Sequence, residues 1–399
     1  MAMITVEEHL ARVLGEVAPL PPCEVPLTEA HGLVLAEPVL AGTDLPVFDN
    51  SSMDGYAVRH ADVASVPATL EVVGEVAAGD GDDPALAAGQ AVRIMTGAPI
   101  PADADAVVLL EHTDGGLVRV TVLQQTAPGT HIRRRGEELR AGDIVLPAGV
   151  RLDPWQLGAT AAAGAGTVTV RPAPRVAVIA TGSELVPPGL PLGRGQIPES
   201  NSTLLAALLR SAGAQLDRVL VVPDDPAALS AQLDDCAGLD LVVLTGGVSV
   251  GAHDIVKELL LPLGVGFASV AMQPGKPQAF GRLPSGVTVF GLPGNPVSVA
   301  VSFEVFVRPA LLRMQGATEL QRRTVGARAA ESWRSAPGRR QYRPVTLDTS
   351  GPVPMARPVS PGGSHMIASL ARAEGLAVVE AGVDEVRAGD EVAVMLVAP

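Results

Sequence analysis

Residues 239–260, LDLVVLTGGVSVGAHDIVKELL, join an apolar run to a helical pattern through a glycine-rich turn. Residues 239–244 are typical of a buried strand, and residues 255–260 begin a helix. Backbone N–H groups converge on an anion at such a strand–turn–helix junction. The turn adds the hydroxyls of Thr245 and Ser249 and the carboxylate of Asp254. It therefore predicts a phosphate site with a divalent cation nearby, although a helix cap is the alternative interpretation of Asp254.

The same alternation of strands and helices extends on both sides of this stretch. Strands are predicted at 175–180, 217–222, 239–244 and 287–290, and helices at 202–212, 226–236, 255–263 and 296–314. Repeated strand–helix units give a doubly wound, mostly parallel sheet covered on both faces. Ligands of such a sheet bind at the carboxyl ends of the strands.

The remaining chain predicts β structure and a discontinuous first domain. Thr5 and Glu8 have capping-box spacing, so a helix is expected through Leu14, followed by extended chain to residue 46. Asp153 and Pro154 open a second short helix, and we expect its apolar face to pack on the first one. The predicted parts are a linker domain (1–46 and 146–174), an inserted β-rich module (47–145), the α/β domain (175–316) and a C-terminal β-domain (317–399).

Composition restricts the class of protein. The 399 residues carry a net charge of −14, which argues against general binding to nucleic acid or to an anionic membrane. Cys23 and Cys236 have neither disulfide-framework nor zinc spacing. The N-terminus lacks an apolar signal core, and no apolar run is long enough to span a bilayer. We therefore expect a soluble cytoplasmic protein.

Four loops follow the predicted α/β strands and should meet at one edge of the sheet. They offer backbone donors, hydroxyls and carboxylates together. Carboxylates beside a phosphate would repel it unless a hard cation lies between them, and Mg²⁺ suits such oxygen ligands. The loops are Thr181-Gly182-Ser183-Glu184, Pro223-Asp224-Asp225-Pro226, the opening turn with Gly246, Gly247 and Gly251, and Pro293-Gly294-Asn295-Pro296.

Plainer interpretations apply to some of these residues. Asp225, before Pro226, fits a helix N-cap, and Pro293–Pro296 fits a simple turn. The chain has no Walker motif and no clear Rossmann fingerprint, and no Ser–His or Cys–His nucleophile is evident.

The β-rich module contributes three further candidate sites. Asp54 lies in a polar, turn-prone loop at 49–57, and Thr96 lies in a Thr-Gly turn that ends a strand. Arg133, Arg134 and Arg135 place three guanidinium groups together, a pattern that suits oxyanions. A salt-bridged surface turn is the alternative, because two glutamates follow.

Seven segments in order resemble the molybdopterin molybdenumtransferases, the MoeA proteins and the E domain of gephyrin. The resemblance covers nearly the whole chain and implies an elongated homodimer whose protomers end in a C-terminal β-barrel-like domain. The segments are FDNSSMDGYAVR (48–59), RIMTGAP (93–99), RRRGEE (133–138), TGSEL (181–185), TGGVSVGAHD (245–254), QPGKP (273–277) and GLPGNPVSVAVS (291–302).

The resemblance implies a reaction between adenylylated molybdopterin and molybdate. Mg²⁺-dependent cleavage of the pyrophosphate bond releases AMP, and molybdenum enters the dithiolene. The implied site lies between the α/β domain of one subunit and the β-module of the other. The adenylyltransferase that supplies the substrate and the molybdoenzymes that receive the product are the implied further partners.

The resemblance also assigns roles to residues of this chain. The implied catalytic residues are Asp54, Thr96, Glu184, Asp254 and Lys276. The implied metal ligands are Glu184, Asp224, Asp225 and Asp254. The implied substrate contacts are Thr181, Gly182, Ser183, Thr245, Gly246, Gly247, Ser249, Gly251, Pro293, Gly294, Asn295, Arg133, Arg134, Arg135 and Ser364.

One departure and two alternatives stand beside this interpretation. Some relatives have lysines where this chain has Ser269 and Gln273, and Arg133–Arg135 could supply the missing charge. The first alternative is an adenylyltransferase that uses ATP, although the β-module and the C-terminal domain argue against it. The second is a dimeric scaffold with a vestigial site, although the intact acidic set argues against it.

Overall fold

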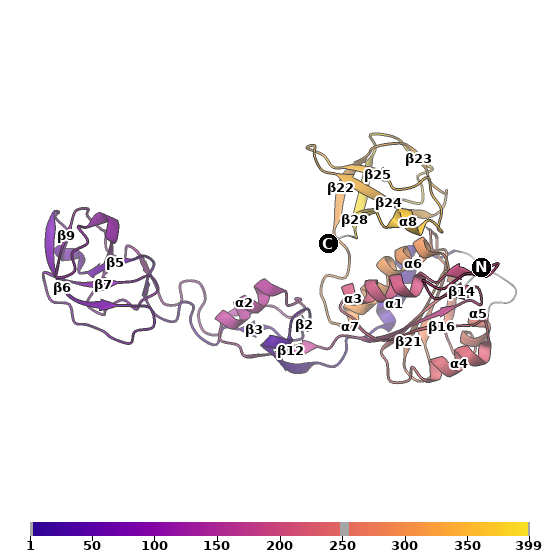
Figure 1. Cartoon of the computed structure of the whole chain (residues 1–399), viewed down its shortest axis with the longest axis horizontal. Helices are drawn as coiled ribbons and strands as arrows, with labels where there is room; N and C mark the ends of the chain where they lie inside the picture. Colours follow the sequence, from indigo (N-terminus) through magenta and orange to yellow (C-terminus); the bar gives the residue numbers. More distant parts are fainter. Residues whose placement is uncertain (1–2, 248–254, 398–399) are drawn as a thin grey trace.

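The computed structural model describes residues 3–247 and 255–397. Figure 1 shows an elongated chain with the β-module at one end, a small linker in the middle, and the α/β and C-terminal parts at the other end. Within the described ranges, no helix has both the length and the apolar character needed to cross a membrane. The predicted fold class, α/β plus β in several parts, is confirmed; the exact domain boundaries stay a prediction.

The α/β part contains a six-stranded sheet in the order β16-β13-β17-β21-β20-β18. The first four strands are parallel, as predicted. At one edge β20 runs antiparallel to β21 and β18 runs antiparallel to β20, and neither strand was predicted. Both lie in a stretch punctuated by Gly and Pro, which hides their alternation. The strands are β13 (Arg175–Thr181), β16 (Gln215–Val222), β17 (Leu241–Thr245), β18 (Gly266–Ser269), β20 (Pro277–Arg282) and β21 (Thr288–Leu292).

Helices cover both faces of this sheet because its side chains alternate between two cores. Val176, Val178 and Val243 face one core with α1, α3, α6 and α7, whereas Ala177 and Ile179 face the other with α4 and α5. The predicted helix at 296–314 is continuous but contains a π-helical segment, η4. The helices are α3 (Asn201–Ser211), α4 (Pro226–Asp234), α5 (Ile255–Leu260), α6 (Pro296–Ser302), η4 (Phe303–Val307) and α7 (Arg308–Met314).

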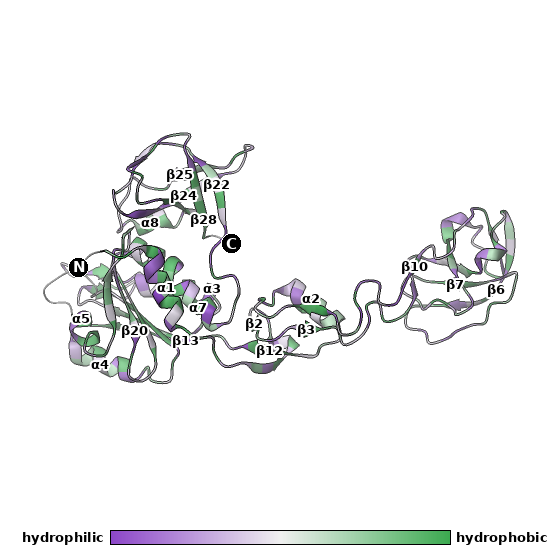
Figure 2. Cartoon of the chain, turned by 180° about the vertical axis from the view of Figure 1, so that it is seen from behind, coloured by the Kyte–Doolittle hydropathy of each residue, from purple (hydrophilic) through white to green (hydrophobic). Residues whose placement is uncertain are grey.

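The first helix, α1 (Val6–Glu16), begins with the predicted capping box: the Glu8 N–H donates to the Thr5 hydroxyl, and the Thr5 N–H donates to the Glu8 carboxylate. The expectation that it packs on the second short helix is wrong. Val6 and Val13 join the α/β core beside α7. Figure 2 shows both hydrophilic and hydrophobic residues on α1, and the larger apolar surface of the α/β part attracts its hydrophobic face.

His9 on α1 is a buried imidazole, and neither ring nitrogen has a hydrogen-bond partner among the described residues. It is 1% exposed and lies edge-on to Phe306 at a centroid distance of 4.7 Å. Burial, with a smaller contribution from Arg12, lowers its pKa from 6.5 to about 4. The ring is therefore neutral in the folded protein near pH 7.

We expect His9→Leu to reduce the acid sensitivity of folding. Between pH 6.5 and about 4 the unfolded chain binds a proton at His9 and the folded chain does not, so stability falls as the pH falls through this window. The loss attributable to this group is about 3 kcal/mol. Urea unfolding at pH 7 and pH 4.5 should show a smaller pH effect in His9→Leu than in the wild type. His31→Gln, at an exposed histidine, is the control, and an unchanged pH effect in His9→Leu would contradict the argument.

The linker combines segments from both sides of the β-module. Strand β12 pairs antiparallel with β1 and β2, and β11 pairs with β3. Trp155, at the start of α2, is 88% exposed. The elements are β1 (Cys23–Pro26), η1 (Leu27–Glu29), β2 (Val34–Leu35), β3 (Val39–Leu40), β11 (Ile144–Leu146), α2 (Pro154–Ala162) and β12 (Thr167–Arg171).

The β-module is a five-stranded sheet, β8-β5-β7-β6-β9, with an apolar cluster on each face. The small pair β4–β10 lies beside it. Its elements are β4 (Asn50–Ser51), β5 (Gly55–Val58), η2 (His60–Asp62), β6 (Ala68–Val76), β7 (Gln90–Ile94), β8 (Ala106–Leu109), η3 (Leu110–His112), β9 (Arg119–Val122) and β10 (Ile132–Arg133).

The C-terminal part forms a closed barrel, because β24 pairs with both β25 and β26 and the ring continues through β28 and β22. Strand β19, from the α/β part, adds to β24. The elements of the C-terminal part are β22 (Thr324–Ala329), β23 (Trp333–Arg334), β24 (Arg340–Asp348), β25 (Met355–Pro358), α8 (Ile367–Leu370), β26 (Gly375–Val379), β27 (Glu385–Val386) and β28 (Glu391–Leu396). Three short strands belong to the α/β part: β14 (Leu185–Val186) and β15 (Ile197–Pro198), which pair with each other, and β19 (Met272–Gln273).

Candidate functional site

A cavity of about 870 Å³ lies between the carboxyl ends of the parallel strands and the barrel. Three of the four predicted loops line it, and the Asp224 end of the fourth reaches it. The predicted residues that line the cavity are Thr181, Gly182, Glu184, Asp224, Thr245, Gly246, Gly247, Lys276, Pro293, Gly294, Asn295 and Ser364. Most of the predicted loop residues are therefore brought to one place.

The first position of the turn after β17, Gly246, requires glycine for steric reasons. Gly246 has a φ of +92°, and a Cβ there would lie 2.4 Å from the carbonyl oxygen of Thr181. The close approach of these two loops brings backbone from β13 and β17 to the same wall of the cavity. This arrangement fits a turn that binds an oxyanion through backbone groups.

The predicted acidic residues separate into two groups. Glu184 and Asp224 line the cavity. The Ser183 N–H donates to Asp224 (3.1 Å), and the Asp224 N–H donates to the Ser183 hydroxyl (3.2 Å), so these two loops hold each other. Asp225 is not among the lining residues, and its carboxylate accepts from the Ala228 N–H at 2.9 Å. The structure thus favours the N-cap interpretation of Asp225 over a metal ligand.

The turn that carries Lys276 is anchored to α6. Gln278 donates to the Gly275 carbonyl at 2.6 Å and to the Ser302 hydroxyl at 2.7 Å. Gly275 has a φ of +104°, and a Cβ there would lie 2.9 Å from the Ser302 hydroxyl. Lys276 follows on a fixed backbone, with an exposed side chain at the cavity wall.

The barrel forms a second wall of the cavity, and Ser364 is the predicted site residue that lies in this wall. The Ser364 carbonyl accepts from the Val297 N–H at 3.0 Å, which joins this loop to the start of α6. Arg343 on β24 also lines the cavity and donates to the Ser360 carbonyl at 2.7 Å. Burial lowers its pKa, although an arginine stays protonated near pH 7. No local signal marked Arg343, because only the closure of the barrel brings β24 here.

Two arginines of the barrel lie at the cavity, and this chain lacks the lysines that some relatives have at positions 269 and 273. Gln273 lines the cavity, whereas Ser269 does not. Arg339 and Arg343 line the same cavity. Besides Lys276, the positive charge at the cavity therefore comes from the barrel. The hypothesis that Arg133–Arg135 supply it is not supported within one chain, since none of the three is a lining residue.

The arginines of the β-module form surface ion pairs instead. Arg134 pairs with Asp49 at 2.6 Å, and Arg135 pairs with Asp44 at 2.5 Å. Arg133 lies in β10, opposite Asn50 in β4. The salt-bridged turn is therefore the better interpretation, although its partners are aspartates rather than the two glutamates that follow.

Asp54 and Thr96 are brought together, but not at the cavity of their own chain. The Asp54 carboxylate accepts from the Thr96 N–H at 2.7 Å and from the Thr96 hydroxyl at 2.8 Å. These hydrogen bonds lower the pKa of Asp54. The pair lies on the β-module, which is separated from the α/β part by the linker (Figure 1).

Three predicted site residues, Ser249, Gly251 and Asp254, lie outside the described residues. Across 3–247 and 255–397, no group of three or more His, Cys, Asp or Glu residues has the arrangement of a metal site. Glu199 also lines the cavity, but its carboxylate accepts from the Ser202 N–H (2.8 Å) and from the Ser202 hydroxyl. Glu184 and Asp224 remain the candidate carboxylates for a cation.

Family models match three consecutive parts of the chain. The first is described as the MoeA N-terminal region (domain I and II) and matches residues 4–164. The second, a probable molybdopterin binding domain, matches 177–313. The third, the MoeA C-terminal region (domain IV), matches 326–397.

Similar proteins match over almost the full length. Molybdopterin molybdenumtransferase 2 of Mycobacterium tuberculosis is 44% identical, covering 98% of this chain and 99% of that protein. Molybdopterin molybdenumtransferase of Haemophilus influenzae is 34% identical, covering 98% of each chain. The crystal structure of the molybdopterin biosynthesis MoeA protein from Pyrococcus horikoshii OT3 superposes with a TM-score of 0.85 at 30% identity, covering 99% of this chain and all of that one.

Proposed function

Because this chain belongs to the molybdopterin molybdenumtransferase family, we propose that it transfers molybdenum from molybdate to adenylylated molybdopterin and releases AMP with Mg²⁺. It is a transferase of molybdenum cofactor biosynthesis. The family and the transferase class are shown, whereas the identities of the substrate and of the metal are our proposal. The observation that supports these identities is the cavity, which combines glycine turns, the carboxylates of Glu184 and Asp224, and cationic side chains.

The chemistry of the lining residues supports the two anionic substrates. The backbone N–H of Gly247 suits a phosphate oxygen, whereas the Gly246 N–H donates to the Leu292 carbonyl at 3.3 Å and holds the turn in place. Lys276 and Arg343, which both line the cavity, suit a second oxyanion such as molybdate. One site then receives both anions, as a transfer between them requires.

Glu184 and Asp224 would hold Mg²⁺ in this cavity, because carboxylate oxygens are the ligands it prefers. A bound Mg²⁺ would neutralise charge on the phosphate oxygens as the pyrophosphate bond breaks. Thr181, Thr245 and Lys276 orient the substrate beside these carboxylates. The reaction needs no covalent nucleophile from the protein, since attack of water on a phosphorus of the pyrophosphate breaks the P–O–P bond and leaves AMP and the molybdopterin phosphate.

We further propose a homodimer in which the β-module of one chain completes the cavity of the other. Asp54 is ionised and paired with Thr96, yet it lies far from the cavity of its own chain. A second copy can bring it there, because a two-fold dimer exchanges equivalent surfaces. The exposed Trp155 on the linker supports a contact between copies, since aromatic residues are enriched at protein–protein interfaces.

The remaining proposals concern location and partners. We propose a cytoplasmic enzyme, and the free thiols of Cys23 and Cys236 fit a reducing compartment. The adenylyltransferase that makes the substrate and the molybdoenzymes that accept the product are the proposed protein partners.

The deciding experiment measures AMP release from adenylylated molybdopterin by the purified full chain. We expect release only when both molybdate and Mg²⁺ are present, and chelation of Mg²⁺ should stop it. The absence of molybdate-dependent release from folded protein would refute the proposal. ATP-dependent adenylylation of free molybdopterin would instead favour an adenylyltransferase, and failure to bind AMP by calorimetry would favour a scaffold.

A further inference from the structure

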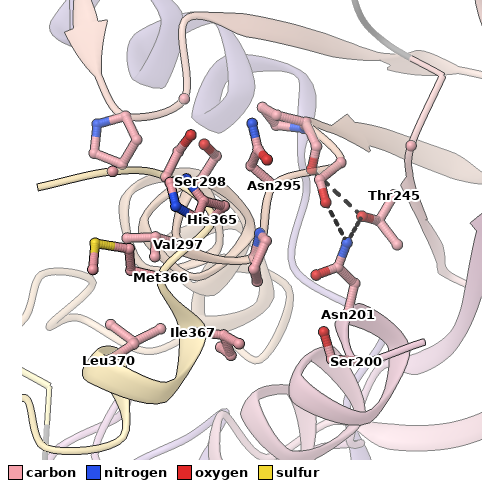
Figure 3. A pocket seen from close by; sticks show the side chains of 18 of the residues that line it. Ser200, Asn201, Thr245, Asn295, Val297, Ser298, His365, Met366, Ile367 and Leu370 are labelled. Carbon is pink, nitrogen blue, oxygen red and sulfur yellow. Dashed lines mark hydrogen bonds between the residues drawn. The ribbon is translucent and has the colours of Figure 1, made fainter. Parts of the chain in front are cut away.

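Asn201, a residue that the sequence analysis did not single out, lies at the first turn of α3 and lines the cavity. Figure 3 shows its side chain reaching towards Thr245, at the end of β17. Three elements far apart in the sequence thus meet at this amide: α3, the turn after β17 and the turn after β21.

The Asn201 amide joins the two turns through its N–H₂ group. Nδ2 donates to the Gly294 carbonyl at 2.6 Å and to the Thr245 hydroxyl at 3.2 Å. The Gly294 carbonyl can only accept, which fixes the orientation of the amide. Thr245 accepts from Asn201 and directs its own hydrogen to the Pro293 carbonyl at 3.5 Å. Both amide hydrogens are therefore used to hold the turns at a set distance.

The other end of the amide is unsatisfied. Asn201 Oδ1 is buried and has no hydrogen-bond partner in the described part of the chain. An unpaired buried acceptor costs about 1–3 kcal/mol. Helix capping does not offset this cost, because Ser200 is the N-cap residue and Asn201 already belongs to the helix. The Thr181 hydroxyl, on the same cavity wall, is likewise buried and unpaired in that part of the chain.

We propose that Asn201 is the positioning residue of this cavity: its N–H₂ group sets the spacing of the Thr245–Gly247 and Pro293–Asn295 turns, and its Oδ1 accepts a hydrogen bond from the substrate. The proposal rests on the proposed function for the identity of that substrate. The matching group is an N–H or O–H donor next to an oxyanion. Adenylylated molybdopterin carries both, on its pterin ring and pyrophosphate.

The two roles reinforce each other. A substrate donor that pairs with Oδ1 removes the cost of the buried acceptor and orders the amide. The ordered amide holds Thr245 and the Gly294 carbonyl, and with them the glycine turn that faces the phosphates. Loss of these hydrogen bonds displaces the glycine turn and the substrate bound to it. Small displacements of a bound substrate lower the rate strongly.

The test compares Asn201→Ala, Thr245→Val and the double variant with the wild-type full chain. For Asn201→Ala we expect kcat/KM to fall roughly 10- to 100-fold and the affinity for AMP, measured by titration calorimetry, to fall about 10-fold. Thr245→Val should lower both less. The double variant should lose less than the product of the two single losses, because both residues belong to one network.

Thr203→Ala, at an exposed position of the same helix outside the cavity lining, is the matched control and should resemble the wild type. Thermal unfolding shows whether each variant folds; for a variant that does not, the milder Asn201→Ser replaces Asn201→Ala in the same comparison. Folded Asn201→Ala with wild-type AMP affinity and kcat/KM would overturn the proposal, as would fully multiplicative losses in the double variant. If the wild type releases no AMP from the substrate, the proposed function fails, whereas the AMP titrations still test Asn201.

Discussion

Asp54→Asn and Glu184→Gln are each expected to lower AMP release about 100-fold or more, and a mixture of the two inactive proteins is expected to regain about a quarter of the wild-type activity. Asp54 and Glu184 lie on different parts of the chain, and only Glu184 lines the cavity. If one chain supplies Asp54 to the cavity of the other, a mixed dimer contains one site with both native residues.

The substitutions preserve shape and remove charge. Asp54 accepts two hydrogen bonds from Thr96, and these lower the pKa of its carboxyl group. The carboxylate is therefore ionised at neutral pH. The contribution of Asp54 to AMP release should disappear only as the pH falls through that lowered pKa. The Asp54→Asn change keeps the volume of the side chain but removes the charge that a cation or a lysine requires. Glu184→Gln likewise keeps the volume of the side chain at the cavity wall and removes its charge.

The experiment measures AMP release before and after subunit exchange, with exchange followed by mass spectrometry of the intact dimers. Glu111→Gln, at an exposed carboxylate of the same β-module, serves as the control and should retain wild-type activity. If mixed dimers form and remain inactive, the shared site is excluded. If either single variant is fully active, that residue has no role in the reaction.

The largest expected effect on stability concerns the ion pair between Glu304 and Arg322. Glu304, in the π-helical segment η4, is 5% exposed, and Arg322 donates to both of its carboxylate oxygens, at 2.9 and 3.1 Å. Arg322 lies in the segment that leads from α7 to the barrel. The pair therefore joins this connection to the α/β core.

We expect Arg322→Ala to lower the free energy of unfolding by about 3–5 kcal/mol, because it leaves a buried carboxylate without its bidentate partner. Arg308 also interacts with Glu304, but its guanidinium donates to the Leu320 carbonyl at 3.3 Å, so we expect it to offset only part of this loss. Urea unfolding followed by circular dichroism measures the difference.

Arg323→Ala, one residue further along and exposed, is the matched control, and we expect a change within about 0.5 kcal/mol. Equal effects of Arg322→Ala and Arg323→Ala would show that the buried pair is not what stabilises this connection. Hydrogen exchange at 303–314 should increase in Arg322→Ala and not in the control, since the carboxylate belongs to that helix.

The periodic parts of the sequence predicted their own structure well. Alternating apolar runs identified the parallel strands, the capping residues Thr5 and Asp225 marked helix starts, and the glycine turn after β17 marked the cavity. These features depend on local hydrogen bonds and on side-chain period, which a short segment contains in full. The two antiparallel strands β18 and β20 were missed because Gly and Pro interrupt their short patterns.

The sequence by itself determined the α/β sheet and the chemistry of its loops, because each strand, turn and helix cap there follows from neighbouring residues. Tertiary structure decided which loops share a cavity. It placed Arg343 and Asn201 in the wall of the cavity, and it placed Asp54 on the β-module, away from the cavity of its own chain. The physical reason is that these relations depend on how barrel, linker and β-module pack across long stretches of chain, and no local hydrogen-bond or hydrophobic pattern records that packing.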